Sequence, residues 1–143
     1  MTERRHIVFL CIANSARSQM AEGLARATAP HGWTVSSAGT NPGRLNPLAT
    51  AVMAEVGIDI GAHRPKRLDE VSVKGADLVV TLCSEEVCPT TPPGVKRLNW
   101  ALPDPAAADG LQEERLEAFR TARSEIQRRL AALWPSLDKV GRS

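Results

Sequence analysis

The sequence predicts an α/β domain in which a four-stranded parallel sheet carries helices on both faces. Four runs of β-branched and aliphatic residues are typical of strands buried on both sides, and segments with helical spacing of apolar residues alternate with them. Strands that alternate with helices in this way pair in parallel. The chain has 143 residues, 43% of them apolar, which is enough for one hydrophobic core. We therefore expect residues 1–143 to form a single domain.

The N-terminal part supplies the first strand, the first helix and the second strand. Residues 6–11 form a continuous apolar run, which predicts a central strand. Residues 16–28 have apolar side chains at helical spacing, and Pro30 follows the predicted helix. Residues 33–37 are predicted to form the second strand.

A second helix is predicted to begin after Asn46. Asn46 is a suitable N-cap, Pro47 fits the first helical position, and Gly57 is a suitable C-terminal stop. The apolar face of this helix is expected to hold Leu48, Val52 and Val56.

The C-terminal part supplies two more strands and a long helix. Residues 77–82 and 95–100 are predicted strands, joined by a polar segment rich in Pro and Thr. A long amphipathic helix follows and is expected to end before Pro135, which leaves residues 136–143 as a flexible tail. The apolar residues that define this helix are Leu116, Phe119, Ile126, Leu130 and Leu133.

This order of elements fits a flavodoxin-like, doubly wound arrangement. Ligands in such folds bind beyond the carboxyl ends of the strands. That rule places residues 11–18, residues 81–88 and the turn after Trp100 along one rim of the sheet. We expect the chemistry of the protein there.

Composition excludes several classes of function. The formal net charge is only +2, so neither nucleic acid nor a membrane surface is expected as a partner. The longest apolar run, from Ile7 to Ala13, is far shorter than the roughly 20 residues of a membrane span, and the N-terminus does not resemble a signal peptide. We therefore expect a cytoplasmic location. Three cysteines, an odd number, favour reactive thiols or core residues over a disulfide framework.

The stretch from Cys11 to Ser18 has the residues of an oxyanion-binding loop. It places a cysteine at the end of a central strand, five residues in a loop, and Arg17-Ser18 at the start of a helix. Successive backbone N–H groups beside a helix N-terminus bind tetrahedral anions, and a guanidinium fork matches two of the oxygens. The backbone candidates are Ile12, Ala13, Asn14, Ser15 and Ala16, with Arg17 as the side-chain donor.

The same loop would activate Cys11 as a nucleophile. A helix N-terminus and a nearby cation stabilise a thiolate, and the Ser18 hydroxyl can donate a further hydrogen bond to the sulfur. The alternative is that Cys11 is a buried core thiol and Arg17 a solvent-facing helix residue. The strand before the loop and the helix after it favour the catalytic interpretation.

Asp104 is the candidate general acid. Attack by Cys11 on a tetrahedral oxyanion expels an oxygen, which leaves more readily as water when a carboxylic acid protonates it. An Asp-Pro pair on its own is more often a turn element. The assignment of Asp104 therefore depends on the presence of Cys11.

Over nearly its whole length the chain resembles the low-molecular-weight protein tyrosine phosphatase fold family and, more closely, its arsenate reductase branch. Besides the Cys-x5-Arg-Ser loop, the matching segments are Ser18–Gly23, Ser37–Thr40, Asn46-Pro47, Gly57–Ile60, Leu68–Glu70, Asp77–Cys83 and Leu102–Ala106. The resemblance implies that Cys11 is the nucleophile, that the loop and Arg17 bind the oxyanion, and that Asp104 is the acid.

The resemblance also implies catalytic roles for the other two cysteines. In the similar reductases a cysteine at the position of Cys83 attacks the Cys11 sulfur, which releases arsenite, and one matching Cys88 then displaces Cys11. The product is a Cys83–Cys88 disulfide that thioredoxin reduces. The alternatives are that Cys83 packs at the end of a strand and that Cys88 is an idle loop residue. A zinc site is disfavoured because no histidine has suitable spacing near this pair.

The chain departs from the family pattern at several positions. Ala13 stands where relatives usually carry Gly, and four residues instead of six separate Cys83 from Cys88. Asn99 stands where His is common.

No cofactor is expected to be required. Some relatives bind potassium through positions that match Asn14, Glu22 and Ser37, so a structural potassium ion is an open possibility. Here Lys66 lies near the position of an acidic ligand, and its ammonium group could replace the ion.

The leading hypothesis is a monomeric arsenate reductase for arsenic detoxification, with phosphate and sulfate as competing oxyanions and thioredoxin or another thiol as the electron donor. One alternative is a phosphatase that uses Cys11, Arg17 and Asp104. The absence of tyrosine, including from residues 41–45 beside the loop, disfavours a phosphotyrosine pocket. The second alternative is an oxyanion- or redox-sensing binding module.

Overall fold

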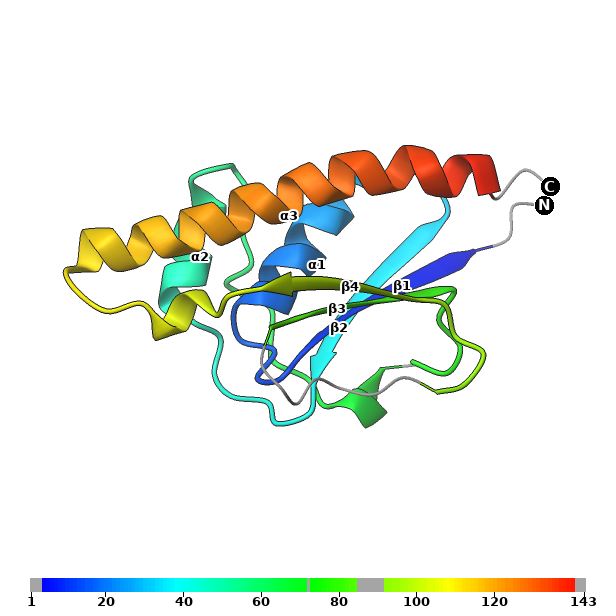
Figure 1. Ribbon diagram of the computed structural model, residues 1–143, viewed down its shortest axis with the longest axis horizontal. Helices are drawn as coiled ribbons and strands as arrows, with labels where there is room; N and C mark the ends of the chain where they lie inside the picture. Colours follow the sequence, from blue (N-terminus) through cyan, green and yellow to red (C-terminus); the bar gives the residue numbers. More distant parts are fainter. Residues whose placement is uncertain (1–3, 72, 85–91, 141–143) are drawn as a thin grey trace.

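The computed structural model describes residues 4–71, 73–84 and 92–140. The described strands are β1 (Arg5–Cys11), β2 (Trp33–Gly39), β3 (Leu78–Cys83) and β4 (Arg97–Leu102). The helices are α1 (Arg17–Thr28), α2 (Pro47–Ala54) and α3 (Gln112–Val140), with short 3₁₀ helices η1 (Leu68–Glu70) and η2 (Pro105–Ala107). The strands pair in parallel in the order β2-β1-β3-β4 (Figure 1). The predicted four-stranded parallel sheet is confirmed.

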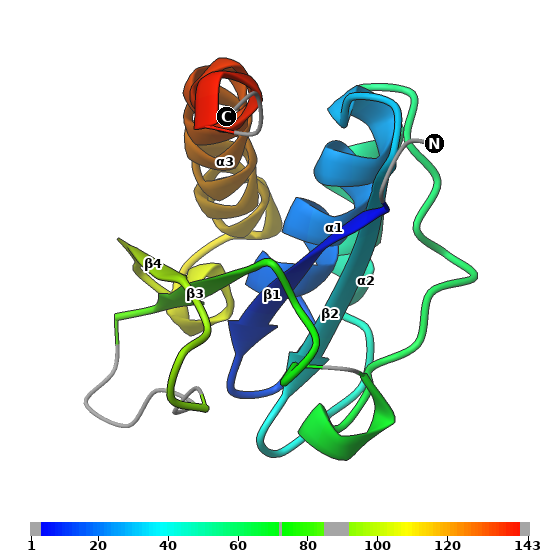
Figure 2. The same cartoon turned by 90° about the vertical axis from the view of Figure 1, so that its right-hand side faces the viewer.

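The two faces of the sheet are covered differently. Ile7 and Phe9 of β1 belong to the larger core cluster, which contains residues of α1, α2 and α3, so all three α-helices lie on one face (Figure 2). Val8 and Leu10 face the other way and contact residues of η1 and of the turns that lead to β3. The second face is thus covered by the short 3₁₀ helix η1 and turns, and not by an α-helix. The chain from α2 to β3 forms turns and η1 where a second helical layer was expected.

Helix α2 begins as its sequence predicts and ends earlier than its apolar pattern suggests. The Asn46 side chain accepts a hydrogen bond from the Leu48 N–H at 2.8 Å, and Pro47 is the first helical residue. Gly57 follows the helix with a positive φ of 78°. Val56 lies beyond the last helical residue and is 38% exposed, so its predicted place on the buried face is wrong.

Helix α3 continues through Pro135 to Val140, whereas the sequence predicts a helix end before the proline. Residues 136–140, assigned to a flexible tail, are therefore helical. Side-chain packing accounts for the difference, because Trp134 donates its indole N–H to Thr28 Oγ1 at 2.9 Å and packs against Trp33 with the rings tilted, and Leu137 is buried. Among the described residues, no helix, including α3, is both long and apolar enough to cross a membrane.

Strand β4 starts two residues later than predicted and contains a bulge. Thr81 pairs with Asn99, but Cys83 pairs with Leu102, so β4 has one residue more than β3 between these pairs. The bulge carries the end of β4 to the rim where β1 and β3 also end. Leu102 thereby lies opposite Cys83, and Asp104 follows two residues later.

Candidate active site: a thiol in an oxyanion-binding loop

The loop between β1 and α1 turns its carbonyl oxygens outward, toward the segment that follows β2. Three backbone N–H groups of that segment bind three loop carbonyls, each at 2.9 Å. The pairs are Asn41 with Ile12, Gly43 with Ala13, and Asn46 with Ser15. The flanking position predicted for residues 41–45 is thereby confirmed.

Outward carbonyls direct the neighbouring N–H groups inward. A peptide unit is planar and trans, so the N–H of each following residue points opposite to the carbonyl. The Asn14 N–H accordingly donates to Cys11 Sγ at 3.3 Å. Among the described non-glycine residues only Asn14 has a positive φ, of 50°. Ala13 does not, so alanine in place of the glycine that relatives usually carry introduces no positive-φ strain.

Cys11 ends β1 at the base of this loop and is only 2% exposed. Its sulfur lies 2.8 Å from Ser18 Oγ. Asn14 Nδ2 donates to the same hydroxyl oxygen at 2.7 Å, which leaves the Ser18 hydroxyl proton to point at the sulfur. Two hydrogen-bond donors therefore face Cys11 Sγ, the Ser18 hydroxyl and the Asn14 N–H.

Arg17 and Asp104 meet Cys11 at one cavity. The cavity has a volume of about 260 Å³. It is lined by Cys11, Ile12, Ala13, Ser15, Ala16, Arg17 and Asp104. Arg17 is 4% exposed, and its Nη1 donates to the Leu102 carbonyl at 2.9 Å. The structure thus brings together most of the site residues predicted from sequence, although Asn14 turns its side chain away from this cavity.

Asp104 caps a turn and lines the cavity that contains Cys11. Its Oδ1 accepts a hydrogen bond from the Ala106 N–H at 3.0 Å, so it caps η2, with Pro105 at the first position of that turn. The same residue lines the cavity above Cys11. The cap therefore holds the Asp104 carboxyl group beside the cavity that Cys11 and Arg17 also line.

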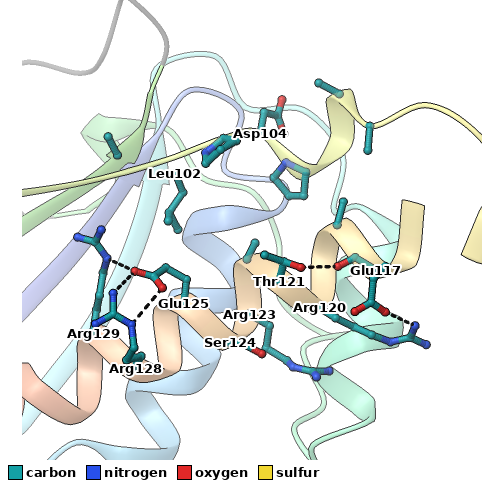
Figure 3. Close-up of a pocket in the computed structure, with 17 residues that line it drawn as sticks. Leu102, Asp104, Glu117, Arg120, Thr121, Arg123, Ser124, Glu125, Arg128 and Arg129 are labelled. Carbon is teal, nitrogen blue, oxygen red and sulfur yellow. Dashed lines mark hydrogen bonds and ion pairs between the residues drawn. The ribbon is translucent and has the colours of Figure 1, made fainter. Parts of the chain in front are cut away.

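A larger cavity, of about 1070 Å³, lies between η2 and α3 and also reaches Asp104 (Figure 3). Its arginines are paired with carboxylates: Arg128 and Arg129 bind Glu125, Arg120 binds Glu117, and both Arg120 and Arg123 bind Glu55 at the end of α2. Of the described residues that line this groove, none is a cysteine. Because its arginines are already paired and no described thiol lines it, we assign the chemistry to the smaller cavity at Cys11.

A buried hydrogen-bond network lies behind the loop. Asn14 Nδ2 also donates to Ser37 Oγ at 3.0 Å, and the Ser37 hydroxyl donates to Glu22 Oε1 at 2.6 Å. The ammonium of Lys66 lies 3.3 Å from the same carboxylate oxygen. The Lys66 backbone N–H donates to Asn14 Oδ1 at 2.8 Å.

The potassium-site candidates Asn14, Glu22 and Ser37 therefore meet, but in an arrangement that does not fit a potassium ion. Potassium is held by oxygen atoms. Asn14 directs its NH₂ group, not its oxygen, toward Ser37, and the Lys66 ammonium lies against the carboxylate oxygen that an ion would need. Within the described residues, no group of three or more His, Cys, Asp or Glu side chains could hold a metal ion.

Gln19 and His63 extend the network, and neither residue was assigned a functional role from the sequence. Gln19 Nε2 donates to Asn14 Oδ1 at 3.0 Å, and His63 Nδ1 lies 3.1 Å from Gln19 Oε1 and 3.4 Å from Glu22 Oε2. Burial lowers the pKa of His63, while the Glu22 carboxylate acts in the opposite direction. The imidazole is therefore mainly neutral near pH 7, and the permanent cations beside Glu22 are Lys66 and Arg26.

Of the other two cysteines, Cys83 lies at the same rim of the sheet as Cys11. Cys83 ends β3, is 1% exposed and is disulfide-bonded, whereas Cys11 is free. Leu10 pairs with Thr81, so β1 and β3 are neighbours and their terminal cysteines lie on adjacent strand ends. Cys88 lies outside the described residues.

Gly39 is expected to be indispensable for the shape of the loop. A Cβ at this position would lie 2.4 Å from the Ile12 carbonyl oxygen and 2.9 Å from the Asn14 nitrogen, and backbone atoms cannot yield as a flexible side chain can. Gly39→Ala should therefore weaken phosphate binding, measured by calorimetric titration, by about tenfold or more and lower stability by about 1–3 kcal/mol. Gly43→Ala is the matched control, since its nearest neighbour is Ala13 Cβ at 3.8 Å. Equal phosphate affinity in the two variants would contradict the expectation.

Three features together define a class of protein: a buried cysteine at the end of a central parallel strand, inward N–H groups, and an arginine at the start of the next helix. It is the class of cysteine-dependent enzymes that bind tetrahedral oxyanions in a phosphate-type loop. An acid at the same cavity is consistent with attack by sulfur and departure of an oxygen.

Comparison with known proteins identifies the family. The family model for low molecular weight phosphotyrosine protein phosphatase matches residues 6–143, and the chain belongs to this family. An arsenate reductase from Bacillus subtilis is 48% identical over 130 residues, which cover 90% of this chain and 94% of that protein.

Solved structures give the same neighbours. An arsenate reductase in the phosphate-binding state superimposes with a TM-score of 0.78 and 33% identity, covering 92% of this chain and 98% of the other. A thioredoxin-dependent arsenate reductase from Corynebacterium glutamicum superimposes with a TM-score of 0.76 and 28% identity, covering 97% of this chain and 64% of that one.

Proposed function

We propose that this chain reduces arsenate to arsenite by a cysteine relay. The observation that carries the proposal is the Cys11 sulfur, which receives two hydrogen bonds at the base of a cavity shared with Arg17 and Asp104. Arsenate is a tetrahedral oxyanion of the kind that such a loop binds. The similarity of most of the chain to arsenate reductases, in sequence and in structure, also supports the proposal.

The first step joins sulfur to arsenic. The Cys11 thiolate attacks arsenic(V), one oxygen leaves, and Asp104 supplies the proton that lets it leave as water. Arg17 and the inward N–H groups of the loop hold the remaining oxygens. No oxidation state changes, and the enzyme carries a sulfur–arsenic bond.

The second step transfers two electrons. The Cys83 thiolate attacks the Cys11 sulfur, the sulfur–arsenic bond breaks with its electron pair on arsenic, and arsenite leaves as a Cys11–Cys83 disulfide forms. Cys88 then attacks Cys83 and frees the Cys11 thiolate. A free Cys11 and a disulfide-bonded Cys83 are consistent with this end state.

A dithiol protein of the thioredoxin type is the proposed reductant of that disulfide. The thioredoxin-dependent neighbour from C. glutamicum supports this choice of donor. We propose that the enzyme acts as a monomer in the cytoplasm, where thiol donors of this kind keep cysteines reduced. Phosphate and sulfate should compete with arsenate because they have the same shape and charge type.

The second candidate function is phosphatase activity, which Cys11, Arg17 and Asp104 can perform without another thiol. The family to which the chain belongs favours it. The segment beside the loop weakens it, since residues 41–45 provide no aromatic wall for an aryl group.

One assay separates these functions. Purified enzyme is given arsenate together with thioredoxin, glutaredoxin or a small thiol in turn, and arsenite is quantified directly; a parallel reaction contains an aryl phosphate. Catalytic arsenite release with thioredoxin is the expected result. Aryl phosphate hydrolysis without any arsenite would establish the phosphatase instead. Phosphate binding without turnover of either substrate would indicate an oxyanion- or redox-sensing module.

A further inference from the structure

The Glu22 carboxylate lies almost entirely away from water. Its side chain is 3% exposed, and a buried carboxylate needs a compensating cation. Lys66, with a side chain 17% exposed, places its ammonium 3.3 Å from Glu22 Oε1. Arg26 contacts the other oxygen at 3.4 Å, but its side chain is 56% exposed and its charge is largely solvated.

The Lys66 ammonium occupies a pocket of oxygen atoms. Besides the Glu22 carboxylate, it donates to the Arg64 carbonyl oxygen at 3.3 Å. The Ser37 hydroxyl binds the same Glu22 oxygen. A monovalent cation would require these same oxygen atoms, so the lysine and an ion exclude each other there.

The same residue reaches the catalytic loop. The Lys66 N–H donates to Asn14 Oδ1, Asn14 Nδ2 donates to Ser18 Oγ, and Ser18 Oγ contacts the Cys11 sulfur. The Glu22 carboxylate joins this chain through Ser37, which accepts from Asn14. The Lys66–Glu22 pair therefore bears on the orientation of the Asn14 amide, and that amide fixes the Ser18 hydroxyl.

We propose that Lys66 is a built-in monovalent cation: its ammonium neutralises Glu22 and holds the Asn14–Ser18–Cys11 network, so that this enzyme needs no potassium ion. Lys66 is a positioning residue, because it acts on Cys11 only through Asn14 and Ser18. The inference concerns oxyanion binding and folding and does not depend on arsenate being the substrate.

The test compares two substitutions that remove the positive charge of Lys66. Lys66→Ala removes the ammonium and leaves space among the oxygens, whereas Lys66→Met removes the charge but keeps most of the side-chain volume. In tetramethylammonium chloride both variants should melt about 5–10 °C below the wild type, because Glu22 stays buried without its main partner. Potassium chloride at the same ionic strength should restore at least about half of that loss in Lys66→Ala and little in Lys66→Met. Lys74→Ala, at an exposed lysine, is the control and should behave as the wild type.

Phosphate affinity gives the second readout. In tetramethylammonium chloride, Lys66→Ala should bind phosphate about tenfold more weakly than the wild type, and potassium should recover the affinity. Lys66→Arg, which keeps the charge, should need no potassium. A wild-type melting temperature that rises by several degrees in potassium would overturn the proposal, as would a Lys66→Ala defect that no cation repairs. Failure to reduce arsenate would contradict the proposed function but not this inference.

Discussion

Cys83→Ser should abolish multiple turnover of arsenate while it leaves Cys11 reactive. A serine hydroxyl cannot form a disulfide, so the sulfur–arsenic adduct loses the thiol at the neighbouring strand end that is proposed to break it, and Cys88 is expected to attack only Cys83. Intramolecular groups react as though present at roughly 10⁵ M or more, far above any free thiol, so steady-state arsenite release should fall by at least about 10³-fold. Alkylation of Cys11 by iodoacetamide should stay within about twofold of the wild-type rate, because the donors to its sulfur come from Asn14 and Ser18.

The number of arsenite molecules released per enzyme molecule gives a sharper test of the relay. Without added reductant, reduced Cys83→Ser should release no arsenite, whereas Cys88→Ser should release about one per enzyme and stop as the Cys11–Cys83 disulfide. Cys83 is buried at a strand end, so Cys83→Ala should be measured as well to separate chemistry from packing. Arsenite release by Cys83→Ser at close to the wild-type rate would eliminate the relay.

Asp104→Asn should slow the chemical step without loosening the loop. Asparagine keeps the oxygen that accepts from the Ala106 N–H, so the cap of η2 should survive. The proton for the departing oxygen is lost, and removal of a general acid typically costs about 10²–10⁴ in rate. We expect that loss in kcat for arsenate, and also for an aryl phosphate if the enzyme hydrolyses one.

Phosphate affinity should change little in Asp104→Asn, since Arg17 and the loop N–H groups remain. Asp109→Asn, at an exposed aspartate a few residues further along the chain, is the matched control. A kcat for Asp104→Asn close to that of the wild type would rule out Asp104 as the acid.

The sequence predicted best what is encoded locally. Cys11, Arg17 and Ser18 lie in one short segment, and the apolar strand before it and the helical spacing after it are local patterns. The Asn46-Pro47 helix start was confirmed for the same reason. The register of the sheet also brought Asp104 to the cavity, as the rule for parallel sheets predicts.

Contacts between distant residues decided what the sequence did not predict. Pro135 alone argues for a helix end, but Trp134 lies against residues more than a hundred positions earlier in the chain. The ion pair of Glu22 with Lys66 joins residues 44 positions apart, so no local pattern marks it and only the family resemblance suggested that Lys66 lies there. Arg17 donates to the main-chain carbonyl oxygen of Leu102. Every residue has such an oxygen, so the amino-acid sequence cannot show which one is the partner.

The Leu102 position links three chemical groups. Its carbonyl holds Arg17, its register partner is Cys83, and Asp104 follows two residues later. Because one stretch of backbone serves all three, substitutions in this edge strand should show strong epistasis with substitutions at any of them. Under the proposed mechanism, anion binding, thiol–disulfide exchange and proton donation are then difficult to alter one at a time. A change of substrate would therefore require coordinated rather than stepwise substitution of this strand.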